Sequence, residues 1–249
     1  MSGHSKWSKI KRGKEKTDAA RGRLFTRIIK EIMVAAREGG GDESGNPRLR
    51  TAILSAKASN MPMVNVDRAI KKGTGELPGQ TFEESSYEAY GPGGAALLIE
   101  VLTDNKNRTT ADVRHILTKH GGSMGSAGSV AWMFEKKGVV SVDKSKITED
   151  ELMELVLDHG AEDINHESDL FEITAPVESL EAVKSALIHA NVPFVSASVN
   201  MIPKNYTKLQ GKQAEQMLAL MEDLDNCDDV QNIFSNFDID ESVMQEFKV

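Results

Sequence analysis

The sequence predicts an α+β protein with an N-terminal helical domain and two ferredoxin-like α+β domains, one inserted in the other. Three observations support this fold class. The chain has 249 residues, a length at which one hydrophobic core stops growing and chains divide into domains. Apolar residues recur with a helical period in the first 73 positions. Beyond residue 80, apolar runs of strand length alternate with helical segments.

The helical domain is predicted from its caps and breaks. A first helix begins at Asp18, a favourable N-cap, and three consecutive glycines end it. Asn46 followed by Pro47 predicts the start of a second helix, because asparagine caps helices and proline fits their first turn. A third, short helix completes residues 17–73. Residues 1–16 are rich in lysine without apolar periodicity, so we expect an extended arm there.

The remainder predicts two α+β units. Residues 139–200 alternate as strand–helix–strand–strand–helix–strand, which is the ferredoxin-like order. Residues 95–134 and the tail after residue 203 each alternate as strand–helix–strand, and together they form a second unit of this kind. The predicted domains are therefore residues 1–80, residues 81–137 with 204–249, and the inserted residues 138–203.

Smaller features are predicted inside the second domain. A helix is expected from Thr109, and the glycine-rich GSMGSAGS segment is expected to be a flexible loop. We expect a strand at Val130–Phe134, followed by a turn at Lys136-Lys137-Gly138.

Charge is distributed unevenly along the chain. The formal net charge is −8, but residues 1–80 hold 17 Lys and Arg against 8 Asp and Glu, a charge of +9, and the rest carries −17. Such asymmetry indicates a nucleic-acid or membrane partner. No apolar run is long enough to span a membrane, and the basic start lacks the apolar core of a secretory signal. The single cysteine, Cys227, fits a reducing compartment. We therefore expect a cytoplasmic protein that binds nucleic acid and no membrane.

The candidate site is the basic surface of the first domain. Lysine and arginine neutralise phosphates and release counterions, and an aromatic side chain among them can stack on an exposed base. The alternatives are a solvated tail for the arm and an ordinary capped helix with an exposed arginine at Arg108. We expect the following side chains to contact nucleic acid: Lys6, Trp7, Lys9, Lys11, Arg12, Lys14, Lys16, Arg21, Arg23, Arg27, Lys30, Arg48, Arg50, Arg68, Lys71, Lys72 and Arg108.

Signs of catalysis and of metal or cofactor binding are weak. The six histidines lack ligand spacing, the glycine-rich loop lacks the lysine of a P-loop, and no nucleophile elbow appears. Cys227 lies in an acidic run, which raises the pKa of a thiol and does not activate it. The sequence therefore predicts no catalytic residue, metal, cofactor or small-molecule substrate, although a hydrolytic pair could lie among its many carboxylates.

Many longer motifs carry a family resemblance. In chain order they are SGHSKWSKIK, DAARGRLFTRIIKEI, NPRLRTAI, NMP, RAIKKGTG, YEAYGPGG, DNKNRTTADVRH, KHGGSMGSAGSVAWMFEKKG, HGAEDI and CDDVQNIFSNF. Together they resemble the YebC/PmpR family of probable transcriptional regulators, which includes mitochondrial translational activators of cytochrome oxidase. The resemblance runs from residue 2 to about residue 240. It implies a helical domain plus two α+β domains, the second interrupted by the third.

Composition and resemblance together predict a non-enzymatic, DNA-binding regulator of transcription. One alternative is a translation factor that uses the same basic domain to bind ribosomal RNA on the ribosome. An alternative of another class is a metal-dependent hydrolase acting in an interdomain cleft. Nothing in the sequence demands a dimer, so we expect a monomer.

Overall fold

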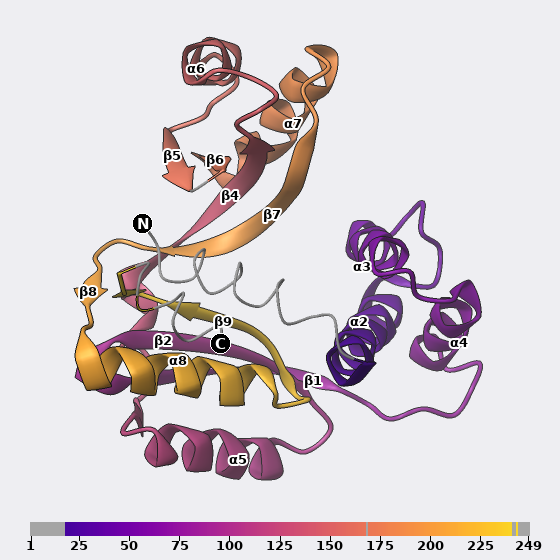
Figure 1. The fold of residues 1–249 in the computed structure, drawn as a ribbon. Helices are drawn as coiled ribbons and strands as arrows, with labels where there is room; N and C mark the ends of the chain where they lie inside the picture. Colours follow the sequence, from indigo (N-terminus) through magenta and orange to yellow (C-terminus); the bar gives the residue numbers. More distant parts are fainter. Residues whose placement is uncertain (1–17, 168, 241–242, 244–249) are drawn as a thin grey trace.

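The structure is a computed structural model that describes residues 18–167, 169–240 and 243. Its first part is a helical unit of three helices, drawn in indigo and violet in Figure 1. These helices are α2 (Asp18–Gly39), α3 (Pro47–Ala58) and α4 (Met63–Gly73). The predicted arm lies outside the described residues.

Asn46 closes the junction between α2 and α3, as the sequence predicts. Its Oδ1 accepts a hydrogen bond from the Leu49 backbone N–H at 3.0 Å, which caps α3. Its Nδ2 donates to the carbonyls of Ala35 at 2.8 Å and Gly40 at 2.9 Å, near the end of α2. One buried side chain therefore satisfies backbone groups of both helices, which fixes their relative placement.

The second part is an antiparallel sheet with strand order β3-β1-β2-β9. Figure 1 shows both α5 and α8 covering one face of this sheet. A separate two-stranded sheet pairs β8 with β10. The elements of this outer unit are β1 (Glu83–Tyr90), η1 (Pro92–Gly94), β2 (Ala96–Thr103), α5 (Lys106–Lys119), β3 (Ser123–Met124), η2 (Ala131–Met133), β8 (Thr207–Lys208), α8 (Gly211–Asp225), β9 (Val230–Ser235) and β10 (Phe237–Asp238).

The inserted part has the strand order β5-β6-β4-β7. In chain order these strands are the second, third, first and fourth, which is the ferredoxin-like arrangement that the sequence predicts. Helices α6 and α7 contribute to the core of this sheet. Its elements are β4 (Phe134–Asp143), α6 (Glu149–Leu157), β5 (Asp163–Glu167), β6 (Leu170–Ala175), η3 (Val177–Ser179), α7 (Leu180–His189) and β7 (Phe194–Pro203).

The α+β fold class is confirmed, but the strands of the outer sheet differ from those expected. Val130–Phe134 does not form a strand of it, because residues 131–133 are a short 3-10 helix and Phe134 begins β4. Within GSMGSAGS, residues 123–124 form the edge strand β3. The opening hairpin β1–β2 supplies two of the four strands.

The predicted turn at Lys136-Lys137-Gly138 is wrong. These residues continue β4, which pairs along its length with β7. A Cβ added at Gly138 would lie 2.9 Å from Cβ of Leu180. The glycine therefore marks the close approach of a helix to the strand, which is the other common reason for glycine in a strand. The expected boundary between residues 137 and 138 falls inside this strand, and the predicted domain limits stay a prediction.

The helical unit packs on the end of the outer sheet. Phe82 and Leu102 of the outer unit share a hydrophobic core with Ile28, Ile32 and other residues of the helices. Figure 1 places α2 beside the ends of β2 and β9. This junction brings one side of α2 against the loop between α8 and β9. None of the helices in the described part of the chain has the length and apolar character that a membrane crossing requires.

Candidate nucleic-acid interface

The junction between the helical and outer units is built on a buried ion pair. Lys30 of α2 lies 2.7 Å from Asp229, which follows α8, and each side chain is less than a tenth exposed. The Lys30 ammonium also donates to the Asp228 carbonyl at 2.9 Å. The Lys30 Nζ lies 5.3 Å from the centre of the Phe82 ring. All of these contacts join segments that are far apart in the sequence.

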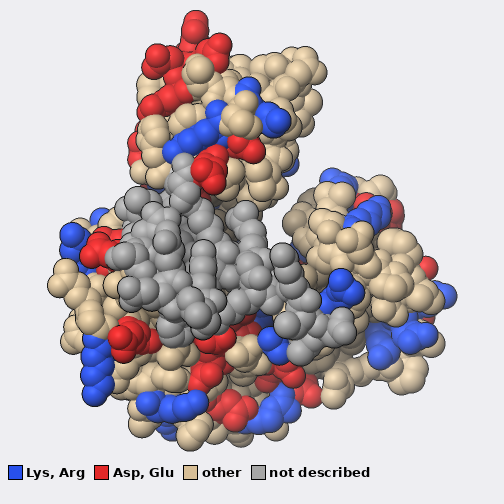
Figure 2. Space-filling model, in the orientation of Figure 1, with Lys and Arg blue, Asp and Glu red and all other residues tan. Residues whose placement is uncertain are grey.

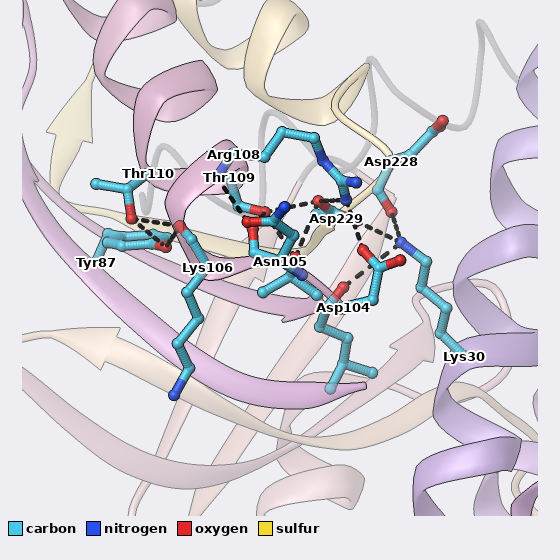
Figure 3. A network of polar contacts seen from close by, with 12 residues as sticks. Lys30, Tyr87, Asp104, Asn105, Lys106, Arg108, Thr109, Thr110, Asp228 and Asp229 are labelled. Atoms are coloured by element: carbon cyan, nitrogen blue, oxygen red, sulfur yellow. Dashed lines mark hydrogen bonds and ion pairs between the residues drawn. The ribbon is translucent and has the colours of Figure 1, made fainter. Parts of the chain in front are cut away.

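Asp229 accepts hydrogen bonds from several further side chains, which Figure 3 shows converging on its carboxylate. Its Oδ2 accepts from the Thr109 hydroxyl at 2.7 Å and from Arg108 Nη2 at 2.9 Å. Burial alone would raise the pKa of Asp229, but the hydrogen bonds from Lys30, Thr109 and Arg108 lower it to about 2. The carboxylate is therefore charged at any physiological pH.

Arg27 forms a second link of the same kind. Its Nη1 lies 3.1 Å from Asp225 Oδ1, and its Nη2 donates to the Asp225 carbonyl. The sequence predicts Arg27 and Lys30 on the basic surface that contacts nucleic acid, but both residues are only 7% exposed. The acidic loop between α8 and β9 covers that side of α2. Arg27 and Lys30 join two units and are not displayed to solvent.

Two other predicted arginines are also engaged within the protein. Arg48 pairs with Glu31 at 2.7 Å, with Glu38 at 2.8 Å and with Glu84. The contacts with Glu31 and Glu84 raise the pKa of Arg48. Arg50 donates to the carbonyls of the loop before α3. Both side chains reach the surface, but Arg48 is paired with carboxylates and Arg50 donates hydrogen bonds to backbone carbonyls.

Arg108 fits the reading of an ordinary capped helix more closely than that of an anion site. The N-cap of α5 is Asn105, whose side chain accepts from the Arg108 backbone N–H at 3.1 Å. The Arg108 guanidinium donates to Asp104 at 2.8 Å and to Asp229 at 2.9 Å. The helix therefore begins with its backbone donors partly satisfied and with carboxylates beside it.

Three of the remaining predicted cations lie exposed on α4. Arg68, Lys71 and Lys72 lie three and four residues apart on α4, so they share one side of that helix. All three are exposed, and none forms an ion pair with any residue that the structure describes. We call them the α4 cationic face. Figure 2 shows blue atoms over the helical unit at the right of the view.

The start of α2 adds two more cations to this unit. Arg21 is exposed and Arg23 is half-buried, and within the described ranges neither has an ion-pair partner. The seven arm residues of the predicted site are outside the described residues. They are Lys6, Trp7, Lys9, Lys11, Arg12, Lys14 and Lys16.

The glycine-rich loop is held by an internal carboxylate. Glu88 of β1 accepts hydrogen bonds from the backbone N–H groups of Gly128 and Val130 at 2.6 Å and of Ala131 at 2.8 Å. Desolvation alone would raise the pKa of Glu88. The backbone hydrogen bonds lower this pKa by a larger amount, so the net shift is downward. A phosphate at this loop would have to displace Glu88. The carboxylate explains how a segment expected to be flexible holds a defined shape.

Cys227 and His120 take structural positions. Burial is the main cause that raises the pKa of the Cys227 thiol, which confirms the expected direction, although burial outweighs the acidic neighbours. His120 lies 2.7 Å from Asp223 and, with Lys119, lowers the pKa of that carboxyl. Within residues 18–167, 169–240 and 243, no three His, Cys, Asp or Glu side chains are arranged to hold a metal ion.

Two clefts flank α2 at the junction. One, of about 1130 Å³, lies between α2 and α5 and includes Lys30, Lys72 and Arg108 in its lining. The other, of about 850 Å³, lies between α2, α3 and the outer sheet and includes Arg27, Arg48 and Gln231. The sequence could not place either cleft, because their walls come from segments up to two hundred residues apart.

Comparison with known proteins identifies the family. Residues 5–76 match the model of the TACO1/YebC protein N-terminal domain, and residues 82–237 match that of the TACO1/YebC second and third domain. The chain belongs to the TACO1/YebC family. This confirms the resemblance that the sequence motifs predict.

Relatives of this TACO1/YebC protein match it over nearly their whole length. A probable transcriptional regulatory protein of Desulfotalea psychrophila is 56% identical, with 99% of each chain covered. A protein of Chlorobaculum parvum with the same description is 55% identical, with 98% of each covered. The crystal structure of a conserved hypothetical protein from Aquifex aeolicus has a TM-score of 0.82 at 44% identity and covers 93% of this chain and 96% of its own.

Proposed function

We propose that this TACO1/YebC protein is a nucleic-acid-binding regulator of gene expression whose helical unit contacts the phosphate backbone. The observation that carries the proposal is the division between two sets of cations. Arg27 and Lys30 are neutralised by acids at the junction, while the α4 cationic face has no ion-pair partner among the described residues. Unpaired, exposed cations on one side of a helix are suited to phosphates.

The acidic surface of the α+β units supports the same orientation. Glu149, Asp150 and Glu151 lie in the first turn of α6, and Figure 2 shows acidic atoms gathered at that end of the inserted unit. These carboxylates repel a phosphate backbone, so nucleic acid approaches from the side of the helical unit.

The target that we propose is promoter DNA, because the relatives are described as probable transcriptional regulatory proteins. The competing target is RNA on the ribosome. Phosphate contacts position a protein without reading sequence, and the α4 cationic face is suited to such contacts.

We propose no catalytic role. Turnover of a nucleic acid or phosphate ester with a divalent metal, lost on substitution of Asp112, a carboxylate that lines the cleft between α2 and α5, would contradict this.

The proposal is tested with two matched triple variants. The α4 variant is Arg68→Glu, Lys71→Glu and Lys72→Glu. The control variant is Lys136→Glu, Lys204→Glu and Lys212→Glu, which changes three exposed lysines of the α+β units by the same charge. Duplex promoter DNA is titrated by gel shift, and ribosomes are cosedimented, both at physiological salt.

We expect wild type and the control variant to bind, and the α4 variant to lose at least tenfold in affinity. Equal loss in both triple variants would mean that net charge alone governs binding. Binding to ribosomes without any binding to DNA would move the proposed role from transcription to translation.

A further inference from the structure

Two residues that line the cleft between α2, α3 and the outer sheet each have a buried donor without an acceptor among the described residues. We call this cleft the α2–β9 groove. The Arg27 side chain is 8% exposed, and its Nε has no hydrogen-bond partner in the described part of the chain, although its terminal nitrogens bind Asp225. Nε2 of Gln231 is likewise buried and unpartnered. Both residues line the groove. An unsatisfied buried donor is costly, so two in one groove indicate that an acceptor belongs there.

The backbone directs Gln231 to this position. In the pairing of β2 with β9, Val101 is opposite Val230 and Glu100 is opposite Asn232, so Gln231 is an extra residue. It is therefore the bulged residue of β9. A β-bulge re-aims a side chain, and bulges are frequent beside functional sites. The bulge accounts for a polar side chain at the junction of the helical and outer units.

The rest of the lining offers both donors and acceptors. The hydroxyls of Ser85 and Ser86 make no hydrogen bond with any residue that the structure describes. Carboxylates of Glu31, Glu84 and Glu100 also line the groove, the first two paired with Arg48 and the third accepting from Asn232. These acids disfavour an anion inside. The occupant is therefore a neutral group that presents acceptors to Arg27 and Gln231.

One further cation, Arg23, is not part of the groove lining. Arg23 lies one helical turn before Arg27 on the same side of α2, and in the described part of the chain it has no ion-pair partner. The ligand therefore needs a neutral part inside the groove and an anionic part outside it. One nucleotide has both, with its base in the groove and its phosphate beside Arg23.

We propose that the α2–β9 groove receives one unpaired nucleobase, whose oxo group accepts hydrogen bonds from Arg27 and Gln231. This inference rests on the proposed function. It specifies single-stranded nucleic acid at this point, because a base stacked inside a duplex enters a protein groove only when it is flipped out of the helix. Uracil, cytosine and guanine carry an oxo group, while adenine does not.

The test is fluorescence anisotropy of the full chain with labelled 12-residue oligo(U), oligo(C) and oligo(A) and with a 12-base-pair duplex. The variant is Gln231→Met, which keeps the side chain's length and removes its donor. The matched control is Gln216→Met on α8, a glutamine of similar exposure far from the groove. A second measurement is the thermal midpoint of each unliganded protein.

We expect wild type to prefer oligo(U) and oligo(C) over oligo(A). Gln231→Met should weaken oligo(U) binding about tenfold, the loss of one good hydrogen bond, and change oligo(A) and duplex binding less than twofold. Its thermal midpoint should not fall, because a donor without a partner has been removed. A purely structural glutamine would lower the midpoint and leave the base preference unchanged.

Two failures are distinguishable. If oligonucleotides bind but Gln231→Met affects none of them selectively, the groove holds water or a different group, and the inference is overturned while the proposed function stands. If wild type binds neither the oligonucleotides nor the duplex, the proposed function fails and the inference fails with it. The same holds if the α4 variant binds them as well as wild type does.

Discussion

Replacing Asp229 by asparagine removes the central charge of the junction between the helical and outer units. Lys30, less than a tenth exposed, then loses its ion-pair partner. Removing one partner of a buried pair costs about 3–5 kcal/mol. Lys30 keeps its hydrogen bond to the Asp228 carbonyl at 2.9 Å, and an asparagine oxygen can still accept from Thr109. The lower end, about 3 kcal/mol, is therefore expected.

The pKa of Asp229 gives a second route to this magnitude. It falls from the ordinary value of 3.8 to about 2, and each unit corresponds to about 1.4 kcal/mol. The carboxylate therefore contributes about 2–3 kcal/mol when it is charged. Since the side chain is 8% exposed, solvent screening does not reduce this figure greatly. The two routes agree within their precision.

Urea unfolding at pH 7, followed by circular dichroism, measures the loss. The matched control is Asp228→Asn, the same chemical change one residue earlier. The Asp228 side chain is exposed, and Lys30 contacts only the backbone carbonyl of this residue. We expect Asp228→Asn to stay within about 0.5 kcal/mol of wild type. If Asp229→Asn is equally stable, the buried network does not hold the junction and the reasoning is refuted.

The same pair of proteins gives a pH dependence of defined sign. The folded pKa of Asp229 lies below its unfolded value, so its stabilisation is present above about pH 4 and is lost as the pH falls towards 2. The stability difference between wild type and Asp229→Asn should narrow across that window. A constant difference from pH 5 to pH 2 would mean that the pKa of Asp229 is not lowered.

Three further predictions concern the scaffold. Glu88→Ala should accelerate amide hydrogen exchange at Gly128, Val130 and Ala131, which lose their acceptor; unchanged exchange would show that the loop is held otherwise. Gly93→Ala should destabilise by about 1–2 kcal/mol, because Gly93 has φ 67° and a Cβ there would meet Leu209; an unaltered urea midpoint would contradict this. Thr148→Ala should cost about 1 kcal/mol, since Thr148 forms a capping box with Glu151; Thr81→Ala, at an exposed threonine outside any helix, serves as the control.

Local chemistry explains which features the sequence could predict. Asn46 and Thr148 cap helices because their side chains bond to N–H groups three residues away, so a short sequence window contains the whole interaction. The strand order of the inserted unit follows from the alternation of its strands and helices. Gly138 was misread because glycine permits both a turn and a close approach, and only the position of Leu180 separates the two.

Long-range pairing explains what the sequence could not predict. Arg27 and Lys30 resemble phosphate-binding cations in the sequence, but their partners Asp225 and Asp229 lie about two hundred residues away. The sequence alone does not distinguish a solvated acidic face from a set of ion-pair partners in the acidic run of residues 222–229. The opposite charges of this run and of α2 indicate that the two could pair, but charge alone does not show which acidic residue contacts which basic residue. The bulge at Gln231 depends on the register between β2 and β9 and has no signature in the sequence.

The salt dependence of nucleic-acid affinity tests the central claim most directly. Dissociation constants are measured between 50 and 200 mM salt for wild type, the α4 variant and the control variant defined above. Each lost phosphate contact reduces the slope of log affinity against log salt by about 0.7–0.9. The account predicts a slope lower by about 2–3 in the α4 variant and unchanged in the control variant. Equal slopes in all three proteins would contradict it.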